Sequence, residues 1–289
     1  MRIYRPMSAG NTRPLQLFLF VVTVLSLVPI LSHAAVFWDD EMEQGNTNFS
    51  AAYMLSTLIP NGDMAYDTSV KFSGNGSIRL NYPANCLQGP TTGSQCGGGI
   101  TRQFPPSLSV YKRVYFRMSG AEPNATADGK FKTSTGAFTK LVKGQSDIVD
   151  GLTARHWWTM GCCGSKNFMI TMEYVPNNTS STNAFSSVTF QDNRWYCIET
   201  HEAMNTPGVA NGVAEAWVDG VKVLTKTAVM WQRVGTNQKW KDFSIIRQEG
   251  MGNIWFDRFA AGDTRIGCSG STAQSDTTPP AIPSGASVR

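Results

Sequence analysis

The chain has 289 residues, of which 16% are charged and 41% hydrophobic, and its formal net charge at pH 7 is +4. Three of the 25 basic residues and none of the 21 acidic residues precede residue 35, so residues 35–289 carry 25 − 3 = 22 basic and 21 acidic side chains. With basic and acidic residues nearly equal in number, the chain lacks the excess of positive charge that is typical of nucleic-acid-binding proteins. The remaining length is enough for one large all-β domain with a substantial core.

The N-terminal segment predicts export. Residues 16–31 form an apolar run without charge that follows three arginines and precedes the small residues around Ala34. These features are typical of a secretory signal peptide, so we expect residues 1–34 to be removed by cleavage after Ala34 or Ala35. An uncleaved anchor is the alternative, although the run is short for a membrane span of roughly 20 apolar residues. Cleavage would leave an extracellular or periplasmic protein that is not attached to a membrane.

Short segments of alternating apolar and polar residues recur between residues 35 and 268, where helical patterns are scarce. Turn-forming clusters of Gly, Asn, Pro or Ser separate them, which predicts an all-β sandwich or jelly roll. The expected strands are 77–82, 110–118, 154–160, 167–174, 195–204, 213–224 and 253–262. Asp219-Gly220 predicts a tight hairpin turn with two positive-φ positions. Residues 269–289 are rich in Ser, Thr and Pro, and we expect a linker or tail there.

The six cysteines all follow the expected cleavage site, which is typical of a protein that folds in an oxidising compartment. Cys86 and Cys96 flank a short polar loop, and we expect them to form a disulfide. Several pairings are open to the remaining cysteines, Cys162, Cys163, Cys197 and Cys268. A zinc site is the alternative, but no spaced Cys/His pattern supports it.

Strand parity sorts the segment TARHWWTM into two faces. Ala154, Trp158 and Met160 share one face and should enter the core, while Arg155 and Trp157 should point away from it. Trp157 is then either a platform on which a sugar ring stacks or a side chain packed under a loop. His156 is expected to be a hydrogen-bonded core residue rather than a catalyst.

The same parity places Glu199 with His201 on one strand, and Glu215 with Trp217 on the next. If the strands form one concave surface, these four side chains converge with Arg155 and Trp157. Charges mixed with indoles are costly to bury and common in binding clefts. The alternative is a solvated face with ordinary ion pairs, such as one between Arg155 and Glu199.

Basic residues are concentrated between Arg102 and Lys143. Eight basic side chains lie in this segment, opposed only by Glu122 and Asp128. This local excess predicts attraction to an anionic polymer, although a solvated flank has the same pattern.

Several motifs occur together in an order that suggests a family. They are FWDDEMEQG, GNGSIRLNY, KLVKG, TARHWW, RWYCIETHEAMNTPGVANGVAEAWVDG and NIWFDRFAAGDTRIG. The chain from residue 36 to residue 268 resembles the concanavalin-like jelly rolls of secreted polysaccharide lyases, particularly the alginate and glucuronan lyase-like group. The resemblance implies a concanavalin-like jelly-roll β-sandwich of two antiparallel sheets across residues 35–268, and an acidic polysaccharide as the partner.

The resemblance also implies site residues. In that group a lysine of a Lys-Leu-Pro-Gly-like strand, a Ser-x-Arg pair and a Tyr-x-Tyr pair line the groove. Lys140 and the pair Thr153 and Arg155 match the first two motifs, but Thr171 and Glu173 stand where the tyrosines would be expected.

For β-elimination we expect Arg155 to neutralise the uronate carboxylate. Lys140 or His201 would act as the base, with Glu199 orienting His201, and the acid is unassigned. We expect the substrate to contact a further set of residues, Thr153, Trp157, Glu215 and Trp217.

Other chemistry has less support in the sequence. The clustered carboxylates of laminarinase-type jelly rolls are absent, and no esterase, metalloprotease or phosphate-loop motif occurs. Asp39, Asp40 and Asp257 lie on terminal strands that often pair in jelly rolls, so together they predict a structural calcium site. No cofactor is expected to be required.

Two functions are compatible with these features. The first is a secreted lyase that cleaves a uronate-containing polymer. The second is a non-catalytic module for glycan binding or surface adhesion, in which Trp157 and Trp217 stack on sugars. A structural exoprotein is a further possibility.

Overall fold

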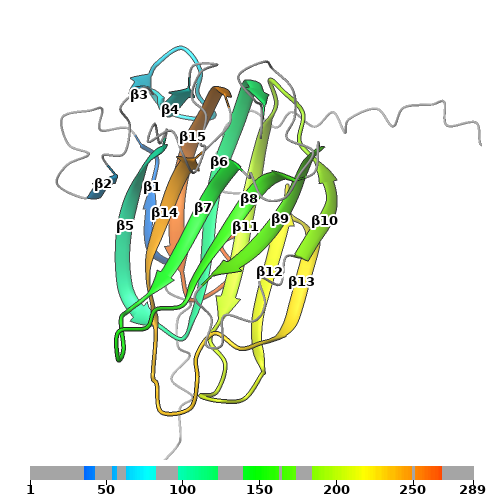
Figure 1. The fold of residues 1–289 in the computed structure, drawn as a ribbon. Helices are drawn as coiled ribbons and strands as arrows, with labels where there is room; N and C mark the ends of the chain where they lie inside the picture. The colour runs from blue at the N-terminus through cyan, green and yellow to red at the C-terminus, as the bar shows by residue number, and fades with distance from the viewer. Residues whose placement is uncertain are drawn as a thin grey trace, which may run out of the picture. The chain divides into compact units, whose positions relative to one another are not determined.

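The computed structural model describes residues 36–42, 54–56, 63–82, 97–122, 139–162, 165–173, 184–248 and 251–268. These residues form two antiparallel β-sheets without a helix, which confirms the predicted all-β jelly roll (Figure 1). The expected signal peptide, the Cys86–Cys96 disulfide and the C-terminal tail lie outside the described residues. Within the described ranges there is also no helix with the length and hydropathy needed to cross a membrane.

Sheet A contains eight strands, in the order β13-β12-β11-β6-β15-β4-β3, with β1 paired to the end of β15. Its strands are β1 (Val36–Asp40), β3 (Asp63–Asp67), β4 (Ser77–Tyr82), β6 (Ser109–Glu122), β11 (Trp195–Ala203), β12 (Gly212–Val218), β13 (Val221–Val229) and β15 (Met251–Gly262). The pairing of β1 with β15 confirms that the two terminal strands are neighbours.

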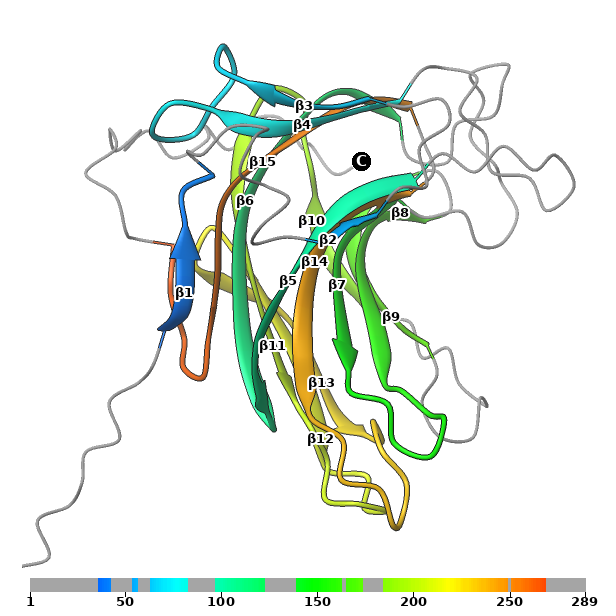
Figure 2. The same cartoon turned by 90° about the vertical axis from the view of Figure 1, so that its left-hand side faces the viewer.

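Sheet B contains seven strands in the order β10-β9-β8-β7-β14-β5-β2. Its strands are β2 (Met54–Ser56), β5 (Gly97–Ser107), β7 (Thr139–Ser146), β8 (Arg155–Cys162), β9 (Ser165–Glu173), β10 (Ala184–Thr189) and β14 (Trp240–Gln248). In Figure 2 strands β5, β7 and β14 are bowed, and the side of sheet B that faces away from sheet A lies on the inside of the bend.

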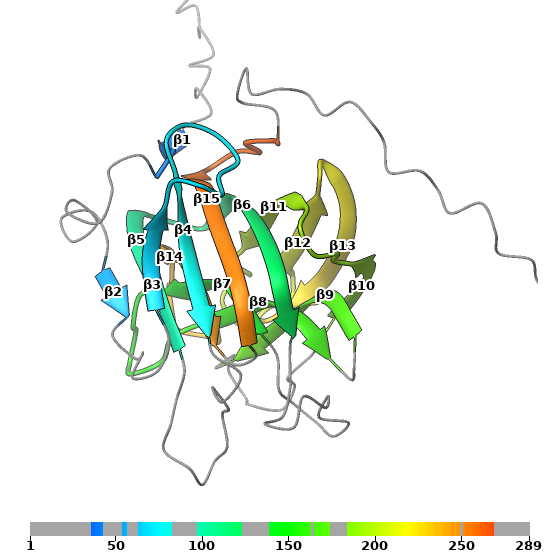
Figure 3. The same cartoon turned by 90° about the horizontal axis from the view of Figure 1, so that it is seen from above.

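The two sheets pack face to face, as the views in Figures 2 and 3 agree. Apolar side chains from alternate strand positions fill the space between them. From sheet B, Trp158, Met160, Phe168 and Ile170 are fully buried, and Phe116 of sheet A is also inaccessible. Their burial confirms the predicted inward face of β8 and β9, and it fixes which residues of these strands point outward.

The Asp-Gly turn is formed as predicted. Asp219 and Gly220 both have positive φ values, 51° and 81°, and they connect β12 to β13. Asp219 further holds β11, because its Oδ1 accepts a hydrogen bond of 2.9 Å from the backbone N–H of Cys197.

An ionic cluster lies inside the core. Glu202 of β11 and Lys112 of β6 form a salt bridge of 2.8 Å, and both side chains are completely inaccessible to solvent. His156 Nε2, from sheet B, lies 2.9 Å from Glu202 Oε1 and 3.0 Å from Lys112 Nζ. The indole N–H of Trp158 donates a 2.6 Å hydrogen bond to the same carboxylate oxygen. The cluster therefore connects the two sheets, and it confirms His156 as a core residue.

Gly144 makes room for this cluster. Any Cβ at this position of β7 would collide with the His156 ring and with Lys112 Nζ. A residue without a side chain is therefore required where the polar groups of both sheets meet. The sheets can approach closely here because β7 contributes only backbone.

Candidate functional site

The predicted convergence of six site residues on one surface is wrong. Arg155 and Trp157 lie on β8 of sheet B, whereas β11 and β12 of sheet A carry the other members, Glu199, His201, Glu215 and Trp217. Each group points away from the core, so the two groups occupy opposite faces of the sandwich. For the same reason Arg155 and Glu199 cannot form the ion pair considered as the alternative.

The outer face of sheet B is a regular grid of polar residues. One row crosses β5, β14, β7 and β8 through Gln103, Asp242, Gln145 and Arg155. The next row crosses five strands through Thr101, Ser244, Lys143, Trp157 and Thr171. Adjacent strands are about 4.8 Å apart, so neighbours in a row can contact the same sugar residue.

Trp157 lies beneath two cations on this face. Its ring centroid is 3.9 Å from Lys140 Nζ and 5.6 Å from Lys143 Nζ, and its side chain is only 6% exposed. Ammonium groups at this distance are attracted by the quadrupole of the indole ring. The outward direction of Trp157 is confirmed, but Lys140 covers the ring face that we expected to be available for stacking.

The outer face of sheet B contains buried polar atoms that have no hydrogen-bond partner in the described part of the chain. Among them are Trp157 Nε1, Thr159 Oγ1, Thr171 Oγ1 and Asp242 Oδ1. An unpaired buried polar group costs about 1–3 kcal/mol. A polyhydroxylated ligand that displaced the covering side chains would supply partners for these atoms.

Asp242 is a residue of this face that the sequence patterns did not single out. It is 6% exposed, and burial raises its pKa, while Lys143, Lys112 and Lys241 act in the opposite direction. A β-bulge between Trp240 and Asp242 interrupts the alternation of β14. The signal that could have identified Asp242 is an acid flanked by core aromatics in the sequence WKDFS.

Thr153 does not belong to the strand that carries Arg155. It precedes β8, and its hydroxyl donates a 3.2 Å hydrogen bond to the backbone carbonyl of Ser146. This contact joins the chain segments that leave β7 and enter β8. Thr153 therefore stabilises the connection between β7 and β8, and this connection positions Arg155.

The outer face of sheet A contains a different network. His201 Nδ1 lies 3.0 Å from Glu215 Oε2, and Lys222 Nζ donates to Glu215 Oε1 at 2.6 Å. Partial burial alone would raise the pKa of Glu215, but the hydrogen bonds from Lys222 and His201 bring it below its usual value. The His201 ring stacks on Tyr111 with centroids 4.1 Å apart. His201 is therefore oriented by Glu215.

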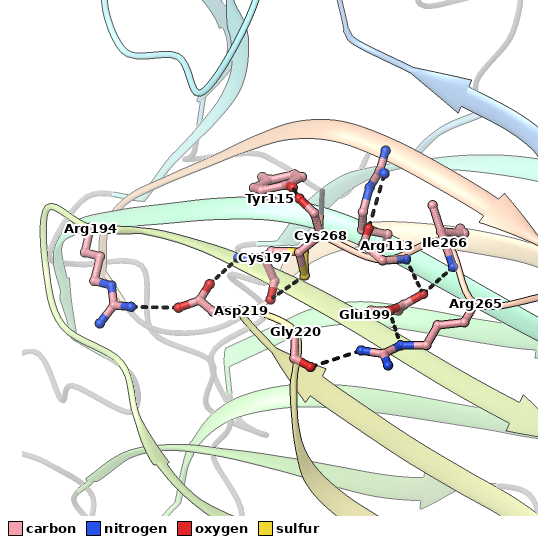
Figure 4. Close-up of a disulfide and its surroundings, with 11 residues drawn as sticks. Arg113, Tyr115, Arg194, Cys197, Glu199, Asp219, Gly220, Arg265, Ile266 and Cys268 are labelled. Carbon is pink, nitrogen blue, oxygen red and sulfur yellow. Dashed lines mark hydrogen bonds and ion pairs between the residues drawn. A yellow bond between two sulfur atoms is a disulfide. The ribbon is translucent and has the colours of Figure 1, made fainter. Parts of the chain in front are cut away.

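Glu199 anchors the chain that follows β15, and the predicted role in orienting His201 is wrong. Its Oε1 accepts hydrogen bonds from the backbone N–H groups of Ile266 and Gly267, at 2.6 and 3.0 Å, and its Oε2 accepts one from Arg265 (Figure 4). The guanidinium of Arg265 also covers Trp217, 4.8 Å from the ring centroid. Glu199 is consequently hydrogen-bonded, and Trp217 covered, by residues of the segment that follows β15.

The same segment is tied to β11 by a disulfide between Cys197 and Cys268 (Figure 4). This pairing is one of those that the sequence left open. Its residues are separated by 71 positions, and a closed loop of this length restricts the unfolded chain strongly.

Replacing both Cys197 and Cys268 by serine is expected to lower the free energy of unfolding by about 2–3 kcal/mol, because the unfolded chain gains conformational entropy. Urea denaturation of the double variant and the parent protein measures this difference. Equal midpoints and equal slopes would contradict the expectation.

The described basic residues between Arg102 and Lys143 do not form one patch. Lys112 is buried in the core, while Arg102 pairs with Asp40 and Arg113 pairs with Asp39. Among the described residues of this segment, Lys140 and Lys143 lie with Arg155 on the outer face of sheet B. The positive charge available to a ligand on this face therefore comes from Lys140, Lys143 and Arg155, and these three side chains lie around Trp157.

The three carboxylates expected to bind calcium do not gather into a ligand set. Asp39 accepts a 2.7 Å hydrogen bond from Arg113, and Asp40 accepts one of 2.8 Å from Arg102. Asp257 accepts hydrogen bonds from three backbone amides. Across the described ranges no group of three or more His, Cys, Asp or Glu side chains is arranged to hold a metal ion. Calcium binding stays a prediction.

Comparison with known proteins supports the fold. No protein-family model and no curated protein sequence matches the chain. An alginate lyase from Aplysia kurodai superimposes with a TM-score of 0.57 at 11% identity, covering 79% of this chain and 99% of that one. An endo-β-1,4-glucuronan lyase from Trichoderma reesei gives 0.52 at 13% identity, covering 80% and 96%. A cellulose-induced protein gives 0.52 at 17% identity, covering 80% and 100%.

These similarities confirm the resemblance to polysaccharide lyases at the level of the jelly-roll fold. Because unrelated functions recur on one fold, activity must be argued from the site itself.

Proposed function

We propose that the protein is a secreted polysaccharide lyase that cleaves an acidic, uronate-containing polymer on the outer face of sheet B. The observation that carries the proposal is the grouping of Lys140, Lys143 and Arg155 around Trp157. Positive side chains at this position would attract the uronate carboxylates and hold the polymer along the strands. The lyase structures that share the fold support the same class of substrate.

The reaction needs a group that stabilises negative charge. As the C5 proton of a uronate leaves, its carboxylate gains enolate character, and a fixed guanidinium nearby lowers the energy of that state. Arg155 has this role in our proposal. Lys140 is the base and acts in its neutral form, while Lys143 and Arg155 remain positive, because His201 lies on the opposite sheet and cannot reach the same sugar.

A non-catalytic glycan-binding module is the second candidate. The observation in its favour is that Thr171 occupies a position where the resembling lyases are expected to have a tyrosine. In this case the cations around Trp157 bind the polymer but do not cleave it.

An assay for unsaturated products separates the two candidates. The mature protein is incubated with alginate, glucuronan and other uronates, and ultraviolet absorbance of the unsaturated product is followed. Absorbance that rises with time supports the lyase. Retention on insoluble glycan, without product from any uronate, would show that the protein binds without cleaving.

Arg155→Ala is expected to lower kcat/KM on the cleaved polymer about 100-fold while leaving the thermal unfolding midpoint nearly unchanged. Arg117→Ala is the matched control, because Arg117 is a strand arginine on the outer face of sheet A, where it donates to Asn193. Equal losses of activity in both variants, or a large loss of stability in Arg155→Ala, would contradict a role of Arg155 in the site.

A further inference from the structure

The proposed elimination leaves one chemical requirement unmet. The oxygen that departs from C4 becomes an alkoxide unless an acid protonates it, and such a proton transfer typically contributes 10²–10⁴-fold to a rate. Arginine cannot release a proton in a protein, and the proposed base must accept one. A third group of the outer face of sheet B has to supply the proton.

We propose that Asp242 is the general acid of this face and donates its proton to the oxygen that leaves C4. This inference rests on the proposed lyase function. Asp242 belongs to β14, two strands away from Arg155 and in the same row of the grid, with Gln145 between them. The separation of these two backbones is about 10 Å, so a sugar bound over Gln145 would have a cation on one side and a carboxyl group on the other.

The surroundings of Asp242 suit a proton donor. Its side chain is 6% exposed, and Oδ1 has no hydrogen-bond partner within the described residues. Burial raises the pKa of the carboxyl group. Lysines from three strands, Lys143 on β7, Lys112 on β6 and Lys241 on β14 itself, and a hydrogen bond from the backbone N–H of Gln145 act in the opposite direction. Their combined effect is smaller than that of burial. The protonated form therefore persists to higher pH than in an exposed aspartate.

The step balances without any further reactant. The base takes the proton from C5, and the electron pair of that C–H bond forms the C4=C5 double bond. The bond between C4 and oxygen breaks, its electron pair stays on the oxygen, and the proton of Asp242 converts that oxygen into a hydroxyl group. The base then gives up its proton to water, and Asp242 regains one from water, which restores the starting state.

The test measures the cleavage rate of the Asp242→Asn variant on two substrates that differ in their leaving group. Asparagine keeps the shape of the side chain and one acceptor oxygen but has no acidic proton. On the polymer the variant is expected to be about 100-fold slower or more. On a synthetic uronate with nitrophenoxide at C4, which leaves without protonation, the variant should match the parent protein. Ser244→Ala, a change on the same face of β14, is the control and should not distinguish the two substrates.

The outcomes separate the acid from the proposed function. If the parent protein releases no unsaturated product from any uronate, the lyase function fails, and the role of Asp242 fails with it. If the parent protein is active but Asp242→Asn cleaves the polymer normally, or is slowed equally on both substrates, the lyase stands and the assignment of Asp242 is overturned.

Discussion

Replacing Glu202 by alanine is expected to lower the free energy of unfolding by about 3–5 kcal/mol, because it leaves a buried ammonium without its counter-charge. Lys112 is completely buried and has Glu202 as its carboxylate partner at 2.8 Å. The indole N–H of Trp158 loses its acceptor as well. Two groups that were satisfied in the core would thus become unsatisfied in a region from which water is excluded.

Urea denaturation measures this effect, and Glu215→Ala is the matched control. Glu215 also pairs with a lysine, but that lysine is 48% exposed, so the control should lose about 1 kcal/mol or less. If the two variants were equally stable, the ionic cluster would not contribute to the stability of the core as described.

Acid is expected to destabilise the protein between about pH 6.5 and pH 4 through His156. The pKa of His156 is lowered from 6.5 to about 4, mainly by burial and also by the ammonium of Lys112, against the effect of Glu202. In this window the unfolded chain binds a proton that the folded protein does not bind, so stability falls as the pH falls. A shift of this size corresponds to roughly 3 kcal/mol, fully present above pH 6.5 and lost near pH 4.

Unfolding free energies at several pH values test this expectation, with His156→Gln as the comparison. The variant keeps a polar side chain but does not titrate, so its stability should change much less across the window. A parent protein and a variant with the same pH dependence would show that other groups cause the loss. Below pH 4.5 a further loss is expected in both, because Lys112 and the hydrogen bonds of the cluster hold the pKa of Glu202 below its usual value.

The elements with regular alternation were predictable. The segment 77–82 is β4, and 195–204 differs from β11 by one residue. Strands β5 and β14 were not predicted, because β5 contains three glycines and two prolines and a bulge interrupts β14 after Trp240. Alternation identifies a strand only where successive side chains point strictly in turn toward the core and away from it, and a bulge breaks this order.

Parity correctly predicted the outward positions of Trp157 on β8 and Trp217 on β12, but it could not say which strands share a sheet. Trp157 and Trp217 were both assigned to an outer face, and both assignments hold. Strand order depends on contacts between residues far apart in the chain, and local patterns contain no information about it. This is why residues of two opposite faces were combined into one expected site.

One member of the ionic cluster, Lys112, could have been recognised from the sequence. Lys112 has the same parity as Val110, Val114 and Phe116, so a charged residue falls among core positions. Because a buried charge is stable only with a partner, this pattern predicts a carboxylate on a neighbouring strand. The partner itself could be found only after β6 and β11 were known to be adjacent.

The bond between Cys197 and Cys268 also determines how the domain responds to mechanical force. Tension applied to the chain beyond Cys268 passes through a covalent link into β11, which is held by β6 on one side and β12 on the other. Without this link the load would begin at β15 and detach the segment held by Glu199. Force applied from the C-terminal side therefore reaches a strand inside sheet A that has a hydrogen-bonded neighbour on each side.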